Sequence, residues 1–330
     1  MFVLNIVQIE ENIYRIPIPV PFPMKYVYCY LFQEADGWSL VDAGFNYPDA
    51  QDTWKQVFEQ LSVNPKSIRS IYLTHFHPDH FGLAGWMQEL TGAKVFISKE
   101  DYLMAERVWG QNSRQASRVG AICRQNGVPD SLASQIEENM RKLSKHVTPL
   151  PSLTILEEKE VTLGGKVWRV IPVPGHSDGH VNFYQPEQRL LLTADHVLDK
   201  ITPNISLWPG CSPNPLKDYF SSLNKINELD IKLVLPAHGA VIDQLQGRIS
   251  EIRLHHERRL NQMFSLAKDG QTAYEIASEV FRNKKLSPHQ WRFAIAETLA
   301  HLEYLVSISQ LIKVDRNGIT FYKQNAEKGA

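Results

Sequence analysis

Short apolar runs and amphipathic segments alternate along the amino-terminal part of the chain. Runs rich in β-branched and aromatic residues, separated by turns that contain proline or glycine, are typical of strands. A longer segment with apolar residues three to four positions apart is typical of an amphipathic helix. The pattern predicts strands at residues 12–17, 26–32, 38–41, 70–74 and 94–97, and a helix at residues 48–60. A further helix, starting near Gly82, joins the last two strands, so we expect that pair to be parallel.

Residues 99–148 interrupt this alternation. They contain helix formers at helical spacing and a break at residues 127–130, with no strand-like run. We therefore predict an insert of two or three helices. Such an insert can form a lid or a wall of a substrate pocket; the alternative is a packing element without substrate contact.

Strand-like runs return in the second half of the chain. They lie at residues 161–163, 165–171, 181–184, 189–193 and 232–235, with a helix at about 218–229. This order suits an α/β fold in which two sheets pack face to face with helices outside, a four-layer αβ/βα sandwich. The two halves would then form a pseudo-repeat.

The composition changes at about residue 245, where a second domain is predicted to begin. Amphipathic helices are expected at residues 248–268, 272–281 and 291–306. Asn317-Gly318 lies between two runs that contain apolar residues, which is a strong hairpin signal. We therefore divide the chain into residues 1–245, which include the helical insert, and residues 246–330.

Composition limits the possible partners and cellular location of the protein. The 330 residues are 43% hydrophobic, enough for a full core, and the formal net charge of -1 argues against a dominant surface for polyanions. The three cysteines, Cys29, Cys123 and Cys211, are far apart and are expected to be free thiols of a reducing compartment. The sequence shows no secretory signal and no apolar run of membrane-spanning length. We therefore expect a cytoplasmic protein without a membrane segment.

The candidate chemistry lies in residues 74–80, with the sequence THFHPDH, at the end of a predicted strand. Four of these residues can bind a metal ion. In an extended segment His75 and His77 point the same way and can hold one cation, while Asp79 and His80 lie just beyond and can hold a second. A solvated histidine-rich turn without metal would be the alternative if this loop stood alone.

This loop resembles the His-x-His-x-Asp-His signature of the metallo-β-lactamase-fold superfamily. The remaining elements of the signature flank it in the expected order, each at or near the end of an apolar run. They are Asp42 in LVDAG, His176 in PGHS, Asp195 in LTAD and His238 in PAHG. The resemblance covers roughly residues 12–245 and implies the metallo-β-lactamase sandwich.

The resemblance also implies a dinuclear metal site. Asp42 would hold the ligand loop without binding metal itself, although a turn-forming aspartate is the alternative. Donors that are all imidazole or carboxylate suit two divalent metal ions, with Zn²⁺ as the default and iron or manganese also admitted. One ion would be bound by His75, His77 and His176, the other by Asp79, His80 and His238, with Asp195 bridging the two.

Such a site implies a metal-dependent hydrolase. The open positions of the two ions would share a water whose pKa lies near neutrality, and the metal-bound hydroxide would attack a polarised carbonyl or phosphoryl group. Asp79 is the catalytic candidate, because it could also transfer a proton at the leaving group. His196 directly follows Asp195 and could support the site or face the substrate, but strand alternation points it away.

The segments expected to contact the substrate, the insert and the loop 197–215, contain no recognisable sequence motif. Trp208, in the loop 197–215, is a candidate apolar contact of a pocket, with ordinary loop packing as the alternative. His180 is expected to be structural or to support the site. The remaining histidines outside the signature carry no motif and are assigned to the surface or the core: His146, His255, His256, His289 and His301.

The ligand set, the insert and a resemblance to glyoxalase-II-like members favour hydrolysis of a thioester, ester or lactone of a small acyl substrate. No glutathione-binding signature is matched. Secreted β-lactamases of this fold often have a cysteine in the place of Asp195, so antibiotic hydrolysis is disfavoured. The oxygen-reducing di-iron relatives would have a glutamate in the place of His77.

The alternative function is that of a metal-dependent endoribonuclease acting on single-stranded RNA. The three carboxyl-terminal helices and the hairpin resemble a winged-helix module, which some superfamily members carry. Residues 248–330 contain 13 Lys and Arg against 9 Asp and Glu, but the expected recognition helix holds Arg292 against Glu297 and Glu303. An acidic helix is poorly built for phosphate contact, so packing or closing the pocket is the favoured role. A third possibility, a winged-helix regulator whose sandwich has lost its activity, is disfavoured by the complete ligand set. For the oligomeric state, a homodimer is compatible with the sequence.

Overall fold

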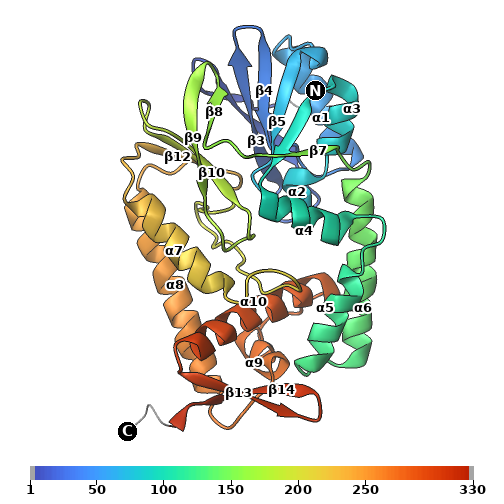
Figure 1. The fold of residues 1–330 in the computed structure, drawn as a ribbon, viewed down its shortest axis with the longest axis vertical. Helices are drawn as coiled ribbons and strands as arrows, with labels where there is room; N and C mark the ends of the chain where they lie inside the picture. Colours follow the sequence, from blue (N-terminus) through green and yellow to red (C-terminus); the bar gives the residue numbers. More distant parts are fainter. Residues whose placement is uncertain (1–3, 327–330) are drawn as a thin grey trace.

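Two β-sheets packed face to face form the core of the molecule (Figure 1). The structure, a computed structural model, describes residues 4–326. The first sheet has the strand order β1-β2-β3-β4-β5-β6-β7, and the second has the order β12-β11-β10-β9-β8. The strands of the first sheet are β1 (Val7–Glu10), β2 (Ile13–Pro19), β3 (Tyr26–Glu34), β4 (Gly37–Val41), β5 (Ile68–Tyr72), β6 (Lys94–Ile97) and β7 (Leu153–Ile155). Those of the second are β8 (Glu160–Leu163), β9 (Lys166–Pro172), β10 (Val181–Gln185), β11 (Leu190–Ala194) and β12 (Leu233–Pro236).

Large aromatic side chains fill the space between the two sheets. Phe32 of β3 packs edge to face on Trp168 of β9, with ring centroids 5.5 Å apart, and Tyr72 packs in the same way on Phe183 at 6.1 Å. Strands β4 to β7 run parallel to one another, as do β11 and β12. The parallel strands β4 and β5 therefore end at the same edge of the sandwich, where the candidate ligand loop begins.

Helices cover the outer faces of the sheets. Helix α1 (Pro48–Gln60) buries Trp54 and Val57, and the Trp54 indole donates a hydrogen bond to the carbonyl of Ala43 at 2.8 Å. The short α2 (Pro78–Phe81) and α3 (Ala84–Thr91) follow the ligand loop, and α7 (Pro215–Asn227) precedes β12. The four-layer α/β sandwich predicted from the sequence is therefore confirmed.

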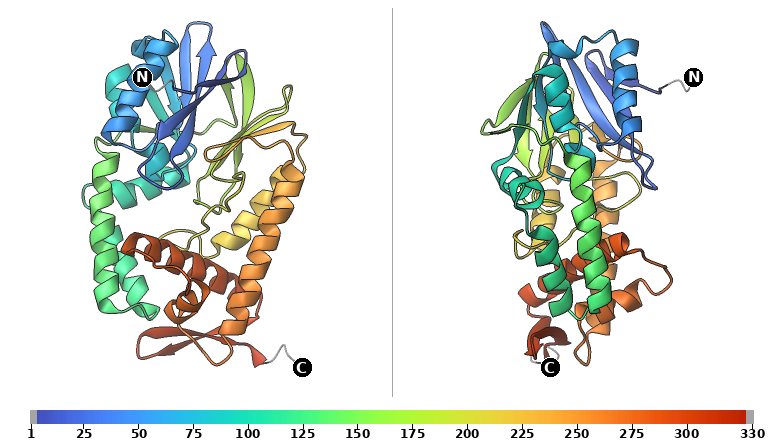
Figure 2. Two further views of the ribbon diagram at one scale, coloured as in Figure 1. Left: turned by 180° about the vertical axis from the view of Figure 1, so that it is seen from behind. Right: turned by 90° about the vertical axis from the view of Figure 1, so that its right-hand side faces the viewer.

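The insert consists of three helices, as predicted. They are α4 (Lys99–Trp109), α5 (Gln115–Gln125) and α6 (Asp130–Leu143), followed by a 3₁₀ turn at Ser144–Val147. The Ser98 side chain caps α4 by accepting a hydrogen bond from the amide of Asp101. Figures 1 and 2 show α5 and α6 reaching away from the sandwich towards the carboxyl-terminal helices.

The carboxyl-terminal part contains the three helices and the hairpin expected from the sequence. They are α8 (Leu245–Leu266), α9 (Ala273–Val280), α10 (Pro288–Ser307), β13 (Leu311–Arg316) and β14 (Ile319–Gln324). Asn317 and Gly318 both have positive φ, which the tight hairpin turn requires. Helix α8 begins at residue 245, and the division into two domains at that point stays a prediction. The resemblance of this part to a winged helix stays a prediction.

Helix α10 spans the molecule opposite the sandwich. It packs against α6 of the insert on one side and against α8 on the other, with α9 beneath it (Figures 1 and 2). The insert, the sandwich and the carboxyl-terminal helices thus form a closed ring. Within residues 4–326, none of the helices is long and apolar enough to cross a membrane.

Candidate metal centre

The ligand loop between β5 and α2 is held by Asp42, which follows β4. Asp42 Oδ1 accepts a hydrogen bond from the amide of Thr74 at 2.8 Å, and Asp42 Oδ2 lies 2.7 Å from His80 Nδ1. The backbone of Asp42 has a φ of 61°, a left-handed conformation that non-glycine residues rarely adopt. These contacts are the ones expected of a carboxylate that positions the loop without binding metal.

Three imidazoles converge at the start of the loop. His75 Nε2 lies 3.1 Å from His77 Nδ1, which in turn lies 2.9 Å from His176 Nε2. His176 comes from the loop between β9 and β10, so the two sheets each contribute to this group. The three side chains form one of two groups whose ligand atoms all lie within 4.8 Å of one another.

The second group joins Asp79, His80, Asp195 and His238. His238 Nε2 lies 3.2 Å from Asp79 Oδ2, and His80 Nε2 lies 3.8 Å from the same oxygen. His238 follows β12, the outer strand of the second sheet. The structure thus brings together all seven residues that the sequence proposed as ligands.

Asp195 lies between the two groups. Its Oδ2 is 3.4 Å from His176 Nε2, while its Oδ1 is 3.5 Å from both His80 Nε2 and His238 Nε2. The preceding residue, Ala194, has a φ of 43°, and this bend at the end of β11 directs the carboxylate into the site. One oxygen towards each group is the arrangement that a bridging ligand requires.

The spacing of the donor atoms fits bound divalent ions. Ligands about 2.0–2.2 Å from a tetrahedral ion lie about 3.3–3.6 Å from each other, close to the separations around Asp195. Among the described residues, His80 Nε2, His238 Nε2 and Asp195 Oδ1 are fully buried and make no hydrogen bond. Buried polar atoms without partners are costly, so the convergence of these three fits a shared cation.

The outer ring nitrogens of the histidines are fixed by acceptors. His176 Nδ1 lies 2.9 Å from the carbonyl oxygen of Asn204, and His238 Nδ1 lies 2.8 Å from that of Tyr26. A carbonyl can only accept, so Nδ1 carries the proton and Nε2 presents its lone pair to the site. The same tautomer follows for His80, whose Nδ1 faces Asp42.

Electrostatics prepares the three-histidine group and Asp79 for metal binding. Burial lowers the pKa of His75 and His77 well below the ordinary histidine value, so both rings are neutral at physiological pH. Burial would raise the pKa of Asp79, but His80 and His238 outweigh this effect and hold it at about 2. Neutral imidazoles and an ionised carboxylate are the forms that bind metal. At His80 and His238, in contrast, the neighbouring carboxylates outweigh burial and raise the pKa of both rings, so a metal ion bound there would displace a proton.

Asp101, at the start of α4, was missed by the sequence analysis. Its buried carboxylate accepts hydrogen bonds from the amide of Phe76 at 3.0 Å, the hydroxyl of Ser177 at 2.7 Å and the amide of Gly179 at 2.8 Å. Phe76 lies between His75 and His77, while Ser177 and Gly179 follow His176 in its loop. Asp101 therefore ties together the two loops that carry the three-histidine group.

His196 and His180 lie behind the site. The His180 ring stacks on His75 at 4.8 Å and lies 6.2 Å from the ring of His196, whose Nδ1 is 3.0 Å from Asn182 Nδ2. His196 is fully buried and does not line the pocket described below. His196 thus lies behind the ligands, but strand alternation is not the reason, because Asp195 and His196 belong to the turn that follows β11.

An apolar pocket of about 480 Å³ opens in front of the ligands His77, Asp79, His176 and Asp195. Side chains of the insert, the loop after Asp195 and α10 line it together. Trp208 is among them, as the sequence suggested. His289 is among them as well, although the sequence analysis assigned it only to the surface or the core. Besides the ligands, the residues that line the pocket include Phe22, Phe76, Met104, Val108, Trp109, Met140, Leu143, Leu198, Ile201, Asn204, Trp208, His289, Arg292 and Phe293.

Comparison with known proteins identifies the family. The model of the metallo-beta-lactamase superfamily matches residues 23–238, which contain every proposed ligand. The chain belongs to the metallo-beta-lactamase superfamily. A second model, the metallo-beta-lactamase-like C-terminal domain, matches residues 260–325. The superfamily assignment and the hydrolases among its relatives make the protein a metallo-hydrolase.

Similar proteins extend over almost the whole chain. A metallo-beta-lactamase family protein from Thermus thermophilus has 32% identity and a TM-score of 0.86, covering 96% of this chain and 100% of its own. The probable metallo-hydrolase YqjP of Bacillus subtilis is 23% identical over 88% of this chain and 91% of its own length. The linear primary-alkylsulfatase of a Pseudomonas species is 23% identical over 78% of this chain, which spans 50% of that protein.

Proposed function

We propose that this metallo-hydrolase cleaves a thioester, ester or lactone of a small acyl compound. The observation that carries the proposal is the position of the seven-residue ligand site in an apolar pocket of about 480 Å³, a size suited to a small molecule. Apolar side chains from the insert and α10 surround the ligands. They favour an acyl chain over a hydrated polymer.

Two divalent ions bound by these residues would supply hydroxide at neutral pH and polarise the attacked carbonyl. The chain itself positions the reactants. Asp79 lines the pocket with an ionised carboxylate, so it is placed to relay a proton from the attacking oxygen to the leaving thiolate or alkoxide. The carbon–sulfur or carbon–oxygen bond breaks, and the products are a carboxylic acid and a thiol or alcohol.

The ions are proposed to be Zn²⁺. Imidazole and carboxylate donors without a thiolate also accept iron or manganese. Metal content after expression in defined medium, followed by reconstitution of the metal-free protein with each ion, decides between them. The metal that restores both a stoichiometry of two per chain and turnover is the functional one.

The test is turnover of a panel of thioesters, esters and lactones by the zinc-loaded protein, with Asp79→Ala as control. Acyl turnover that disappears in the control supports the proposal. Absence of turnover on the whole panel, with two ions bound, would overturn it.

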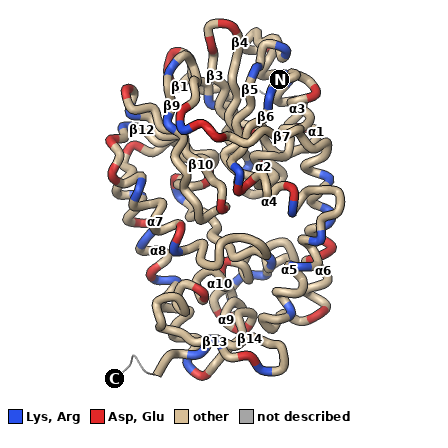
Figure 3. The backbone as a smooth tube through the Cα atoms, in the orientation of Figure 1, with Lys and Arg blue, Asp and Glu red and all other residues tan. Residues whose placement is uncertain are grey.

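A sulfate ester is the second candidate substrate. The alkylsulfatase among the relatives and the apolar pocket both motivate it, and a linear alkyl sulfate therefore belongs in the same panel. RNA cleavage finds less support, because basic and acidic residues are interspersed over the carboxyl-terminal elements (Figure 3). A labelled single-stranded RNA in the panel tests it directly.

A further inference from the structure

Arg292, on α10, places a buried cation in the wall of the substrate pocket. Its side chain lines the same pocket as the metal ligands, and the residue is only 8% exposed. The guanidinium lies over two aromatic rings, 4.5 Å from the centroid of Phe293 and 5.6 Å from that of Trp208. These aromatic faces and the surrounding apolar side chains keep it away from bulk water.

No acidic partner accompanies this arginine. Within residues 4–326, Arg292 forms no ion pair and no hydrogen bond, and its Nε is buried without a partner. Burial lowers its pKa to about 10, so it is still charged at neutral pH. A buried charge without a counter-charge is costly, and such groups usually mark a binding site rather than a packing role.

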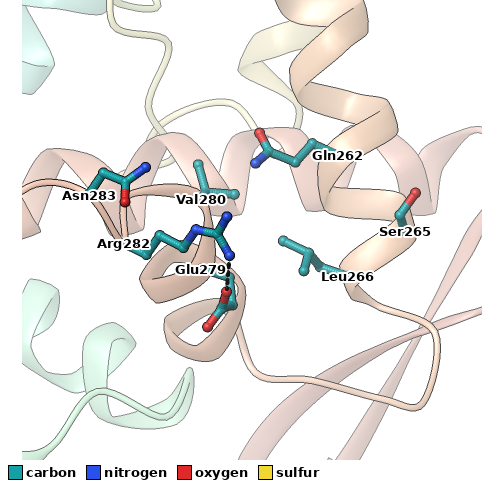
Figure 4. A pocket seen from close by; sticks show the side chains of 7 residues that line it. All are labelled: Gln262, Ser265, Leu266, Glu279, Val280, Arg282 and Asn283. Atoms are coloured by element: carbon teal, nitrogen blue, oxygen red, sulfur yellow. Dashed lines mark ion pairs between the residues drawn. The ribbon is translucent and has the colours of Figure 1, made fainter.

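Two arginines of the described residues, one in the core and one in a second hollow, show the contrast. Arg15 is similarly buried, but it donates to the carbonyl of Gly239 at 2.6 Å and to the hydroxyl of Tyr30 at 3.2 Å. A second hollow, between α8 and α9, contains Arg282, and Figure 4 shows it paired with Glu279, 3.8 Å away. Arg292 is thus distinguished by the lack of a protein partner in an otherwise apolar pocket.

The charges of the pocket are separated. Its only ionised side chains among the described residues are the ligands Asp79 and Asp195 and the cation Arg292. Helix α10 lies across from the sandwich edge that carries the ligands (Figure 1). His289 adds no second cation, because burial holds its pKa at about 4. The pocket therefore offers a metal centre, an apolar middle part and a single positive charge.

We propose that Arg292 binds a carboxylate of the substrate, at a distance from the acyl bond that lies at the metal centre. The inference rests on the proposed function and narrows its substrate to an ester or thioester that carries a second, anionic end. The planar guanidinium suits a carboxylate, which it can hold through two parallel hydrogen bonds. A group with two negative charges would leave one of them unpaired in apolar surroundings.

Matched substrates test the proposal in the zinc-loaded enzyme. The half-thioester of adipic acid and the hexanoyl thioester of the same thiol differ at the far end of the acyl chain, carboxylate against methyl. We expect kcat/KM to favour the adipoyl compound by at least 10-fold, mainly through KM. Arg292→Gln should abolish this preference, while Arg282→Gln, in the second hollow, should retain it. No preference in the wild type, or the same preference in Arg292→Gln, would overturn the proposal.

Measuring the binding of non-hydrolysable ligands tests the carboxylate site at Arg292 independently of the proposed hydrolytic activity. Adipate and hexanoate can both place one carboxylate at the metals, but only adipate offers another to Arg292. Calorimetry should show at least 10-fold tighter binding of adipate by the wild type and equal affinities in Arg292→Gln. This result would support the carboxylate site even if no acyl compound is hydrolysed. Equal affinities in the wild type would exclude the site even if thioesters are cleaved.

The substrate could also carry an anionic group other than a carboxylate at the end that contacts Arg292, and a third experiment tests this outcome. Terminal sulfonate and phosphonate analogues of adipate carry one and nearly two charges, respectively. Affinity that follows the order carboxylate, sulfonate, phosphonate supports a site for a carboxylate. Tightest binding of the phosphonate would overturn the assignment to a single-charge group.

Discussion

The Asn204 side chain donates a hydrogen bond to Glu297 of α10 at 3.2 Å, while the backbone carbonyl of Asn204 holds His176 Nδ1. A metal ligand is thereby connected to the carboxyl-terminal helices through one residue. Glu297 is in turn 3.8 Å from Arg259 of α8. The carboxyl-terminal part thus contributes to the order of the metal centre as well as to the pocket wall.

Glu297→Ala should weaken metal binding. Without its acceptor, Asn204 can move and His176 loses its fixed orientation, so zinc affinity should fall by about 10-fold, as for other residues that orient ligands. Competition with a chromophoric chelator measures this affinity. The matched control is Glu303→Ala on the same helix, because Glu303 binds Lys313 and Tyr322 of the hairpin and, within residues 4–326, makes no contact with Asn204. Equal losses in the two variants would contradict a specific connection to His176.

Asp79→Ala and His238→Ala should each lose one of two metal ions. Both residues belong to the second group of ligands, whereas the three-histidine group stays intact. Metal analysis should give one zinc per chain, turnover should be largely lost, and circular dichroism should show a retained fold. His255→Ala, a histidine outside both groups, serves as control. Two ions per chain in either ligand variant would refute the assignment.

Asp101→Asn should loosen the loops of the three-histidine group. An amide can accept at one position only, so its NH₂ group would face a donor such as the amide of Gly179. The lost hydrogen bond and the unsatisfied donor should cost about 1–3 kcal/mol of unfolding free energy. Denaturant titration of the zinc-loaded protein measures this loss, and metal analysis should show weakened retention of one ion.

Asp101 should also make stability depend on pH. Burial raises its pKa to about 7 in the folded protein, above the value of 3.8 for an unperturbed side chain. The folded state therefore keeps a proton that the unfolded state releases. The stabilising contribution of this proton is full below about pH 4 and declines as the pH rises to about 7. Relative to Asp101→Asn, the wild type should lose up to about 4 kcal/mol over this range. Denaturation of both proteins with chelator present removes the contribution of metal, and parallel pH profiles would disprove the assignment.

Arg292→Met should stabilise the protein. The substitution replaces a buried charge without a partner by an apolar side chain of similar length, and comparable replacements add about 1–4 kcal/mol. Chemical denaturation measures the gain, and Arg282→Met, at an exposed ion pair, should change stability by less than about 0.5 kcal/mol. A destabilised Arg292→Met variant would mean that the arginine has a structural partner.

The sequence predicted the sandwich and the ligands for the same physical reason. Apolar strands end abruptly in metal-binding residues, so the positions of His75, His176 and His238 follow from local patterns. Two strands were missed. β7 (Leu153–Ile155) has only three residues, and β1 (Val7–Glu10), with the sequence VQIE, lacks the continuous apolar run of the equally short β6. Their pairing with longer strands gives them their structure.

Asp101 and Arg292 could not be predicted because distant segments create their surroundings. In the sequence, Asp101 resembles any acidic residue in the first turn of a helix, and only the folded chain places Phe76 and Ser177 against it. Arg292 shares its helix with two glutamates and thus resembles a surface residue. Its isolation arises from Trp208 and from the packing of α10 on the insert.

The pocket takes its walls from segments as far apart as Phe22 and Phe293. During synthesis, the sandwich and its last ligand, His238, leave the ribosome before α10 has been made, and domains generally fold in that order. The metal centre can therefore assemble while it is still open to incoming ions. Selection among substrates begins only after α10 has docked between α6 and α8.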